Sequence, residues 1–151
     1  MFTYATLCQS EWTDYNGHMN DAMYGRVFSD AIDAMMNEVG LDEAYRRQTK
    51  GTIYTMEDHR WYEWEVHAGA ELRIETHLID FDAKRMHTWQ GLFVGQQRCA
   101  ACETMLMHIS QAGETPKSAP MPDTILDELA THKTNNNHSP RAQAMGIRRK
   151  S

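Results

Sequence analysis

The chain has 151 residues, a formal net charge of −6 at pH 7 and three cysteines. This length predicts one domain with its own core, and the acidic charge without a long basic stripe argues against nucleic-acid binding. No apolar run approaches the roughly 18 residues that indicate a membrane-spanning helix. The odd cysteine number and the lack of a signal-peptide pattern lead us to expect free thiols in the cytoplasm.

The N-terminal part predicts a strand, a polar loop and a long amphipathic helix. Residues 2–9 favour a strand, and residues 21–39 place apolar side chains at helical spacing. Asn20 is the expected N-cap of this helix, and Gly40 occupies the expected position just after its end.

The rest of the chain predicts a sheet followed by a short extension. A charged helical or turn segment is expected at 41–50, and the further strands are expected at 52–66, 72–78, 84–94 and 98–110. This order predicts an α+β fold with a five-stranded antiparallel sheet over residues 1–111. Residues 112–151 are expected to hold a loop, a short helix at 123–132 and a polar tail.

Neither the cysteines nor the histidines predict a metal or redox site. Cys99 and Cys102 form a C-x-x-C spacing, but on a strand residues three apart point to opposite faces. The eight histidines show no ligand spacing on one element. We therefore expect no metal.

The polar loop before the long helix carries the strongest chemical signal. It contains Asp14, Asn16, Gly17, His18 and Asn20. A carboxylate beside the free N–H groups of a helix N-terminus is a suitable arrangement for catalysis at a carbonyl. Gly17 is expected to adopt a positive φ.

The motif Asp-x-Asn-x-His-x-Asn at 14–20, followed by a helix with an early Tyr24, resembles the acyl-CoA thioesterases of the hotdog fold, the 4-hydroxybenzoyl-CoA thioesterase superfamily. Segments 11–24, 52–69 and 82–87 are most similar to thioesterases of carnitine catabolism that act on betainyl-CoA. The resemblance implies one long helix wrapped by a curved sheet. It also implies a homodimer or dimer of dimers with interfacial active sites, and no cofactor beyond the substrate's CoA.

The resemblance gives Asp14 the role of catalytic carboxylate, as general base or as nucleophile. The backbone N–H of Asp21 is the expected oxyanion donor, with its own carboxylate pointing away. Asn16 is expected to hold Asp14 or the thioester. His18 and Asn20 are candidates for substrate contact or for ordering the loop.

A second polar group is expected on the strand at 52–66. Thr55, Glu57 and His59 alternate along it and are predicted to share one face. In the resembling family this strand crosses the partner's motif loop, so Glu57 and His59 are candidates to assist catalysis across the interface. The ordinary alternative is a solvated strand face.

Substrate contacts are expected from aromatic and basic residues. A quaternary ammonium acyl group favours an aromatic cage, and the alternative for these rings is core packing. Lys84 and Arg85 are the expected contacts of the CoA phosphates. The candidate rings are Trp12, Tyr15, Tyr24, Trp61 and Tyr62.

The sequence thus predicts an acyl-CoA thioesterase that hydrolyses a short polar acyl-CoA, with betainyl-CoA favoured. One alternative is an aromatic or medium-chain acyl-CoA substrate, which a methionine-lined pocket would favour. Another is a non-catalytic acyl-CoA-binding domain, which a buried salt bridge at Asp14 would favour. The methionines in question are Met23, Met36, Met56 and Met86.

Overall fold

The computed structural model describes residues 1–133 and 146–147, so the polar tail expected after residue 133 lies almost wholly outside the described residues. The helical elements are a 3₁₀ turn η1 (Ser10–Trp12), α1 (Asp21–Glu38), α2 (Glu43–Thr49) and α3 (Asp123–His132). The strands are β1 (Phe2–Leu7), β2 (Gly51–Tyr62), β3 (Glu71–Phe81), β4 (Arg85–Val94), β5 (Gln97–Ser110) and β6 (Lys117–Ser118). Among the described helices, none is both long and apolar enough to cross a membrane.

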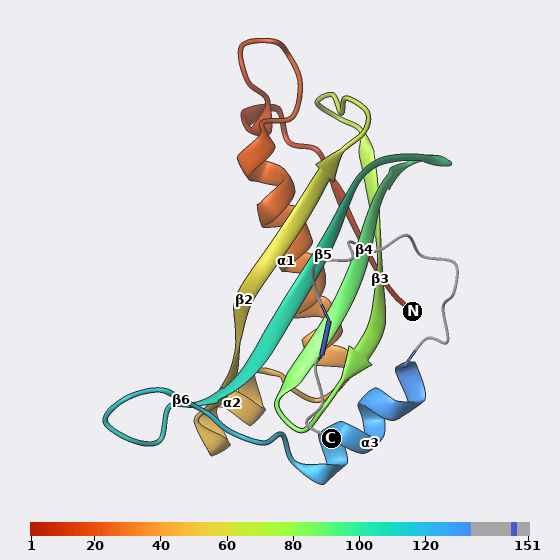
Figure 1. Cartoon of the computed structure of the whole chain (residues 1–151). Coiled ribbons are helices and arrows are strands. Elements are labelled where there is room, and N and C mark those ends of the chain that lie inside the picture. The colour runs from red at the N-terminus through yellow and green to blue at the C-terminus, as the bar shows by residue number, and fades with distance from the viewer. Residues whose placement is uncertain (134–145, 148–151) are drawn as a thin grey trace.

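One curved antiparallel sheet carries the fold, and α1 lies across one of its faces (Figure 1). The strand order is β1-β3-β4-β5-β2, and the two-residue β6 adds to β5 beyond that path. The predicted α+β hotdog arrangement is confirmed. The short β6 was not predicted, because two residues carry no periodicity.

The ends of α1 are set by local hydrogen bonds. The Asn20 side chain accepts from the N–H of Ala22 at 3.0 Å, which caps the first turn as predicted. At the other end Gly40 has φ +87°, and the N–H of Leu41 returns to the carbonyl of Met36 at 2.8 Å. This left-handed stop closes the helix without straining a side chain.

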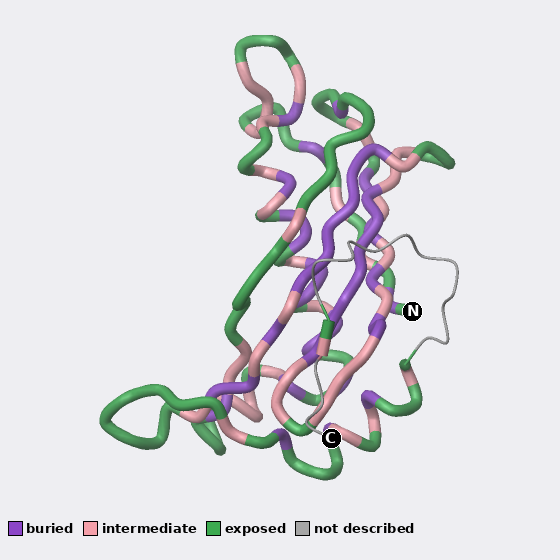
Figure 2. The backbone as a smooth tube through the Cα atoms, in the orientation of Figure 1, coloured by how far each residue is buried: buried purple, intermediate pink, exposed green. Residues whose placement is uncertain are grey.

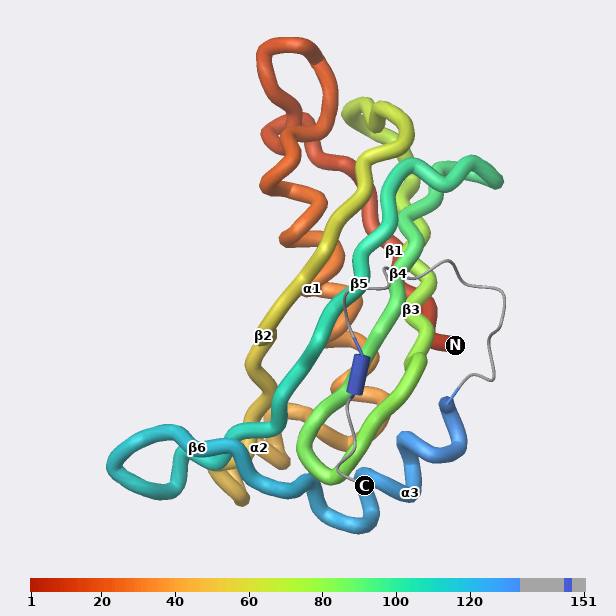
Figure 3. Tube along the Cα trace, viewed as in Figure 1, coloured from red at the N-terminus to blue at the C-terminus, as the bar shows by residue number. Residues whose placement is uncertain are grey.

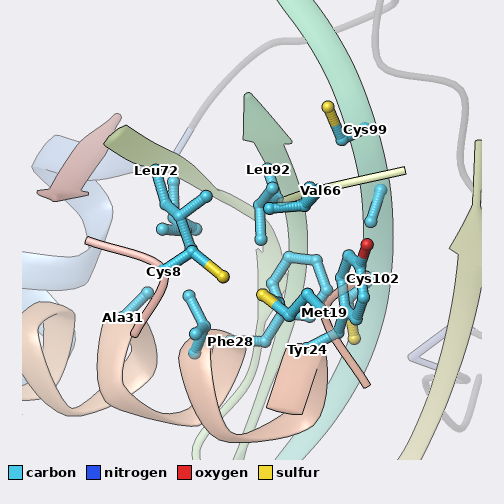
Figure 4. Close-up of a cluster of buried hydrophobic side chains, with 13 residues drawn as sticks. Cys8, Met19, Tyr24, Phe28, Ala31, Val66, Leu72, Leu92, Cys99 and Cys102 are labelled. Atoms are coloured by element: carbon cyan, nitrogen blue, oxygen red, sulfur yellow. The ribbon is translucent and has the colours of Figure 1, made fainter. Parts of the chain in front are cut away.

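Two of the three buried apolar clusters in the described residues lie along α1, and the third is a small group of Ile79, Trp89 and Ala101 on the sheet. The first, near the helix N-terminus, joins Met19, Tyr24 and Phe28 to the sheet residues Leu72 and Leu92 (Figure 4). The second lies near the helix C-terminus and includes residues from α3 such as Ile125 and Leu129. The division after residue 111 stays a prediction, but α3 packs into the same core as the sheet.

Burial is uneven across the sheet. β4 and β5 are buried along most of their length, whereas β2 is exposed over nearly all of its length (Figure 2). β2 pairs with β5 on one side only. Large apolar side chains on it, including Tyr54 and Met56, face solvent in the single chain.

A β-bulge overturns the predicted face assignment on β2. Thr55 pairs with Leu106 and Glu57 with Met105, so Met56 has no partner on β5. The extra residue moves Thr55 to the face toward α1, where it lines a cavity of about 330 Å³ with Asp58 and Arg60. Glu57 and His59 therefore lie on the opposite face from Thr55.

Two further predictions were wrong, namely the end of β2 and the placement of the two cysteines on β5. β2 ends at Tyr62 rather than at residue 66, because the N–H groups of Glu63 and Trp64 both turn to the carbonyl of Cys99. A register shift between β4 and β5 next to Cys99 places Cys99 and Cys102 in the same apolar cluster, not on opposite faces. Both thiols are free.

We predict that Gly40→Ala destabilises the fold. A Cβ at φ +87° is strained and would lie 3.2 Å from the Cδ1 atom of Ile125. The expected loss is about 1–2 kcal/mol in the free energy of unfolding, measured by urea denaturation. Gly113→Ala, with a Cβ 3.9 Å from its nearest neighbour, is the control and should change stability little. Equal effects of the two substitutions would contradict the assigned helix stop.

Candidate active site

The motif loop is a closed turn at one end of the molecule (Figure 3). The N–H of Asp14 donates to the carbonyl of His18 at 2.9 Å, and the N–H of Gly17 donates to the carbonyl of Asp14 at 3.0 Å. Gly17 has φ +77°, as predicted. These bonds fix Asp14 and His18 at the base of the loop.

A second segment, the connection between β2 and β3, is joined to this loop. The N–H of Met19 donates to the carbonyl of Val66 at 2.7 Å, and His18 forms a backbone bridge with His67. Met19 and Val66 are buried, so the joint lies in the core. Residues far apart in sequence thereby face one another at the start of α1.

The start of α1 offers a donor next to a carboxylate. The Asp14 side chain is half-buried, and its Oδ1 accepts from the N–H of Asn16 at 2.8 Å. The Asn20 side chain caps Ala22 and the Asn20 carbonyl accepts from Met23. In the part of the chain that the structure describes, the N–H of Asp21 is left without an acceptor. It is therefore available to a developing oxyanion.

These groups line a hollow of about 830 Å³. Five residues predicted for the site contribute to it: Asp14, His18, Asp21, Tyr24 and Tyr62. Met19 and four residues not singled out from the sequence complete the lining, the latter being Glu63, Trp64, Glu65 and His67. No local pattern could have found these four, because only the joint to Met19 brings them to the loop.

The two tyrosines form one corner of the hollow. The rings of Tyr24 and Tyr62 meet edge to face, with centroids 5.2 Å apart and planes at 84°. Burial, followed by the nearby thiols and acidic groups, raises the pKa of Tyr24 to about 12. Tyr24 therefore stays a neutral phenol throughout the physiological range.

Other predicted contacts lie outside this hollow in the single chain. Trp12 packs against the first core cluster, while Tyr15 and Asn16 are exposed at the loop tip. Glu57 and His59 bond to each other at 3.0 Å on the sheet face away from α1. Trp61 shares that face and contacts Trp89, with ring centroids 5.4 Å apart.

The predicted CoA-phosphate residues lie at the opposite end of the protomer, in the turn between β3 and β4 (Figure 1). Lys84 and Arg85 line a second hollow of about 420 Å³ there. Arg85 donates to the carboxylate of Asp82 at 2.5 Å. Burial alone would raise the pKa of Asp82, but the hydrogen bonds from Arg85 and from backbone N–H groups hold it below its usual value.

One group of side chains has the composition of a metal site. His18 Nε2 lies 3.2 Å from Glu65 Oε2, and a nitrogen of His67 completes a group whose ligand atoms lie within 4.8 Å of one another. His67 Nδ1 also contacts the carbonyl of Gly17 at 3.2 Å. This group could not be predicted from the sequence, since its members come from two segments. The expectation that the protein binds no metal stays a prediction.

Known proteins of similar sequence point to one family. A family model described as the thioesterase-like superfamily matches residues 8–129. A betainyl-CoA thioesterase of Pseudomonas aeruginosa is 40% identical over 126 residues, which cover 82% of this chain and 78% of that protein. An L-carnitine dehydrogenase/betainyl-CoA thioesterase of Agrobacterium fabrum is 38% identical over 78% of this chain, which spans 25% of that longer protein.

Solved structures show the same fold. A hypothetical protein from Staphylococcus aureus in complex with CoA superimposes with a TM-score of 0.86 at 27% identity, covering 99% of this chain and 95% of its own. A putative thioesterase from Pseudomonas putida KT2440 superimposes with a TM-score of 0.81 at 31% identity, covering 100% of this chain and 97% of its own. With the motif loop, the helix and the sheet all included in these matches, the chain belongs to the thioesterase-like superfamily.

Proposed function

We propose that the protein hydrolyses betainyl-CoA to glycine betaine and CoA, with Asp14 as the catalytic carboxylate. The observation that carries this proposal is the placement of Asp14 and the free Asp21 N–H in one hollow at the start of α1. The similarity to betainyl-CoA thioesterases supports the choice of acyl group.

In the proposed reaction Asp14 acts as general base. In the described part of the chain the Oδ1 atom of Asp14 accepts from the N–H of Asn16, so its second oxygen is the one that we assign to the attacking water. Asp14 takes a proton from that water as the water oxygen attacks the thioester carbon. The N–H of Asp21 donates to the resulting oxyanion, aided by the helix dipole. Collapse breaks the C–S bond, and the proton passes from Asp14 to the leaving thiolate.

The structure favours this reading over the two alternatives. None of Met23, Met36, Met56 and Met86 is among the described residues lining the hollow, and Met86 is fully buried. A pocket for a medium-chain acyl group would need such an apolar lining. Among the described residues no salt bridge blocks Asp14, which speaks against a merely binding role.

We propose that the active unit is at least a homodimer, joined through β2. A twelve-residue edge strand with exposed Tyr54, Met56 and Trp61 is a surface that needs a partner. Pairing β2 with its symmetry mate would join two sheets into one and would place Glu57 and His59 near the interface. A dimer of dimers is compatible with the same edge contact.

Such a dimer also supports a role for Lys84 and Arg85 with the CoA phosphates. Antiparallel pairing of two β2 edges brings the motif-loop end of one protomer beside the opposite end of the other. The β3–β4 turn of the partner would then lie about three strand spacings away, roughly 14 Å, within reach of an extended CoA.

We further propose that the enzyme is cytoplasmic, binds no nucleic acid and uses no cofactor beyond the CoA of its substrate.

Replacing Asp14→Asn should lower kcat for betainyl-CoA by about 10²–10⁴-fold with little change in KM, because the amide cannot accept the proton. Both kinetic constants are measured from the rate at which the free thiol of CoA is released from the acyl-CoA. Glu114→Gln, which removes a charge in the exposed β5–β6 loop, is the control and should leave the rate unchanged. An unchanged rate in the Asp14 variant would reject the assignment. A first turnover in H₂¹⁸O that gives unlabelled acid would instead show direct attack by Asp14.

Proline at position 56 tests the proposed dimer edge. Met56 is the bulged residue without a partner on β5, so Met56→Pro should disturb the free edge of β2 more than it disturbs the β2–β5 ladder. Sedimentation should show a shift from dimer toward monomer, with loss of activity and an unchanged circular dichroism spectrum. Met56→Thr keeps the N–H and should remain dimeric. A proline variant with the wild-type mass would exclude pairing through β2.

A further inference from the structure

One wall of the hollow is a four-residue segment that runs from Tyr62, the last residue of β2, to Glu65. The N–H groups of Glu63 and Trp64 bind the carbonyl of Cys99 at 2.8 and 3.0 Å. On the other side, Val66 is buried and joined to Met19. The segment, here called the wall, is therefore held at both ends.

The wall presents two aromatic rings to the hollow. The exposed fractions of Tyr62 and Trp64 are 53% and 63%, so both rings have surface free for a ligand. Tyr24 on α1, only 5% exposed, contacts the ring of Tyr62 and limits how far that ring can turn. Open ring faces of this kind attract cations that cannot donate hydrogen bonds.

The charge of the hollow has one sign. Its described lining contains four carboxylates, those of Asp14, Asp21, Glu63 and Glu65, and no lysine or arginine. Glu63 is neutralised, because Arg98 binds both its oxygens at 2.7 and 2.8 Å. Among the described residues Glu65 forms no ion pair with a lysine or arginine, and it faces the imidazoles of His18 and His67. Glu65 is thus the wall residue whose negative charge can act on a ligand in the hollow.

We propose that Tyr62, Trp64 and Glu65 form the subsite for the trimethylammonium group of the substrate. This assignment rests on the proposed hydrolysis of betainyl-CoA. A quaternary ammonium has no N–H, so recognition must come from ring faces and from a nearby anion rather than from directed hydrogen bonds. The wall supplies both, on the side of the hollow that faces Asp14 and the Asp21 N–H.

The subsite should determine selectivity for the charge of the acyl group and not for its shape. The matched pair of substrates is betainyl-CoA and 3,3-dimethylbutyryl-CoA, in which carbon replaces the charged nitrogen. Both have the same thioester and nearly the same volume, so the ratio of their kcat/KM values reports the recognition of charge. A residue that only shapes the pocket would change both values together.

We expect wild type to prefer betainyl-CoA. Tyr62→Leu and Trp64→Leu should each lower the ratio by about 3- to 30-fold, the range of one cation–π contact. Glu65→Gln should lower it by about 2- to 5-fold, because its carboxylate is largely exposed. Tyr62→Phe keeps the ring and should keep the ratio. Glu71→Gln, which removes an exposed charge outside the hollow, is the charge control.

The outcomes separate the two proposals. A wild-type preference that persists in all three wall variants would overturn the assigned subsite and leave betainyl-CoA as the substrate. Equal losses toward both substrates would show that the wall is structural. A wild-type enzyme that hydrolyses both thioesters equally would overturn the proposed substrate, and the subsite with it. A reduced ratio in the wall variants, with both controls unchanged, is the result we expect.

Discussion

The hydrogen bond between the N–H of Met19 and the carbonyl of Val66 is the contact on which the site depends. Both side chains are buried in the first core cluster (Figure 4), so the bond is shielded from water. The motif loop with Asp14 lies on one side of this bond, and the wall ending at Glu65 lies on the other. One buried anchor therefore sets the distance between the Asp14 carboxylate and the residues opposite it.

The helix whose N-terminus lines the hollow is itself fixed to the sheet. Gln90, buried on β4, donates from Nε2 to the carbonyl of Phe28 in α1 at 3.1 Å and to the hydroxyl of Thr76 on β3 at 3.0 Å. Because these polar groups lie in an apolar core, releasing them would cost more than one exposed hydrogen bond. The N-terminus of α1 is thus held in place before any substrate binds, which is what oxyanion stabilisation requires.

The proposed dimer contact and the proposed acyl subsite share one element. β2 presents its free edge to solvent, and the same strand ends in Tyr62, where the wall begins. The bulge at Met56 determines which side chains of β2 lie on each face of the sheet. Asp58 and Arg60 lie toward α1, and Glu57 and His59 lie on the outer face. A partner that paired with this edge would therefore stabilise the strand that supports the acyl subsite.

The sequence by itself determined the features that arise within a few residues of chain. The cap at Asn20, the stop at Gly40, the positive φ of Gly17 and the helix at 123–132 all follow from local hydrogen bonds and backbone sterics. The motif from Asp14 to Asn20 likewise indicated the thioesterase family.

Only the tertiary structure decided which distant groups face that loop. The bulge at Met56 arises from pairing with β5, a strand some fifty residues further along the chain, so no alternation pattern in β2 could reveal it. Trp64 and Glu65 enter the hollow because Val66 bonds to Met19, a contact between segments that are adjacent only after folding. Helix caps and turns are local and can be predicted from sequence, whereas strand register and the joining of loops depend on the whole fold.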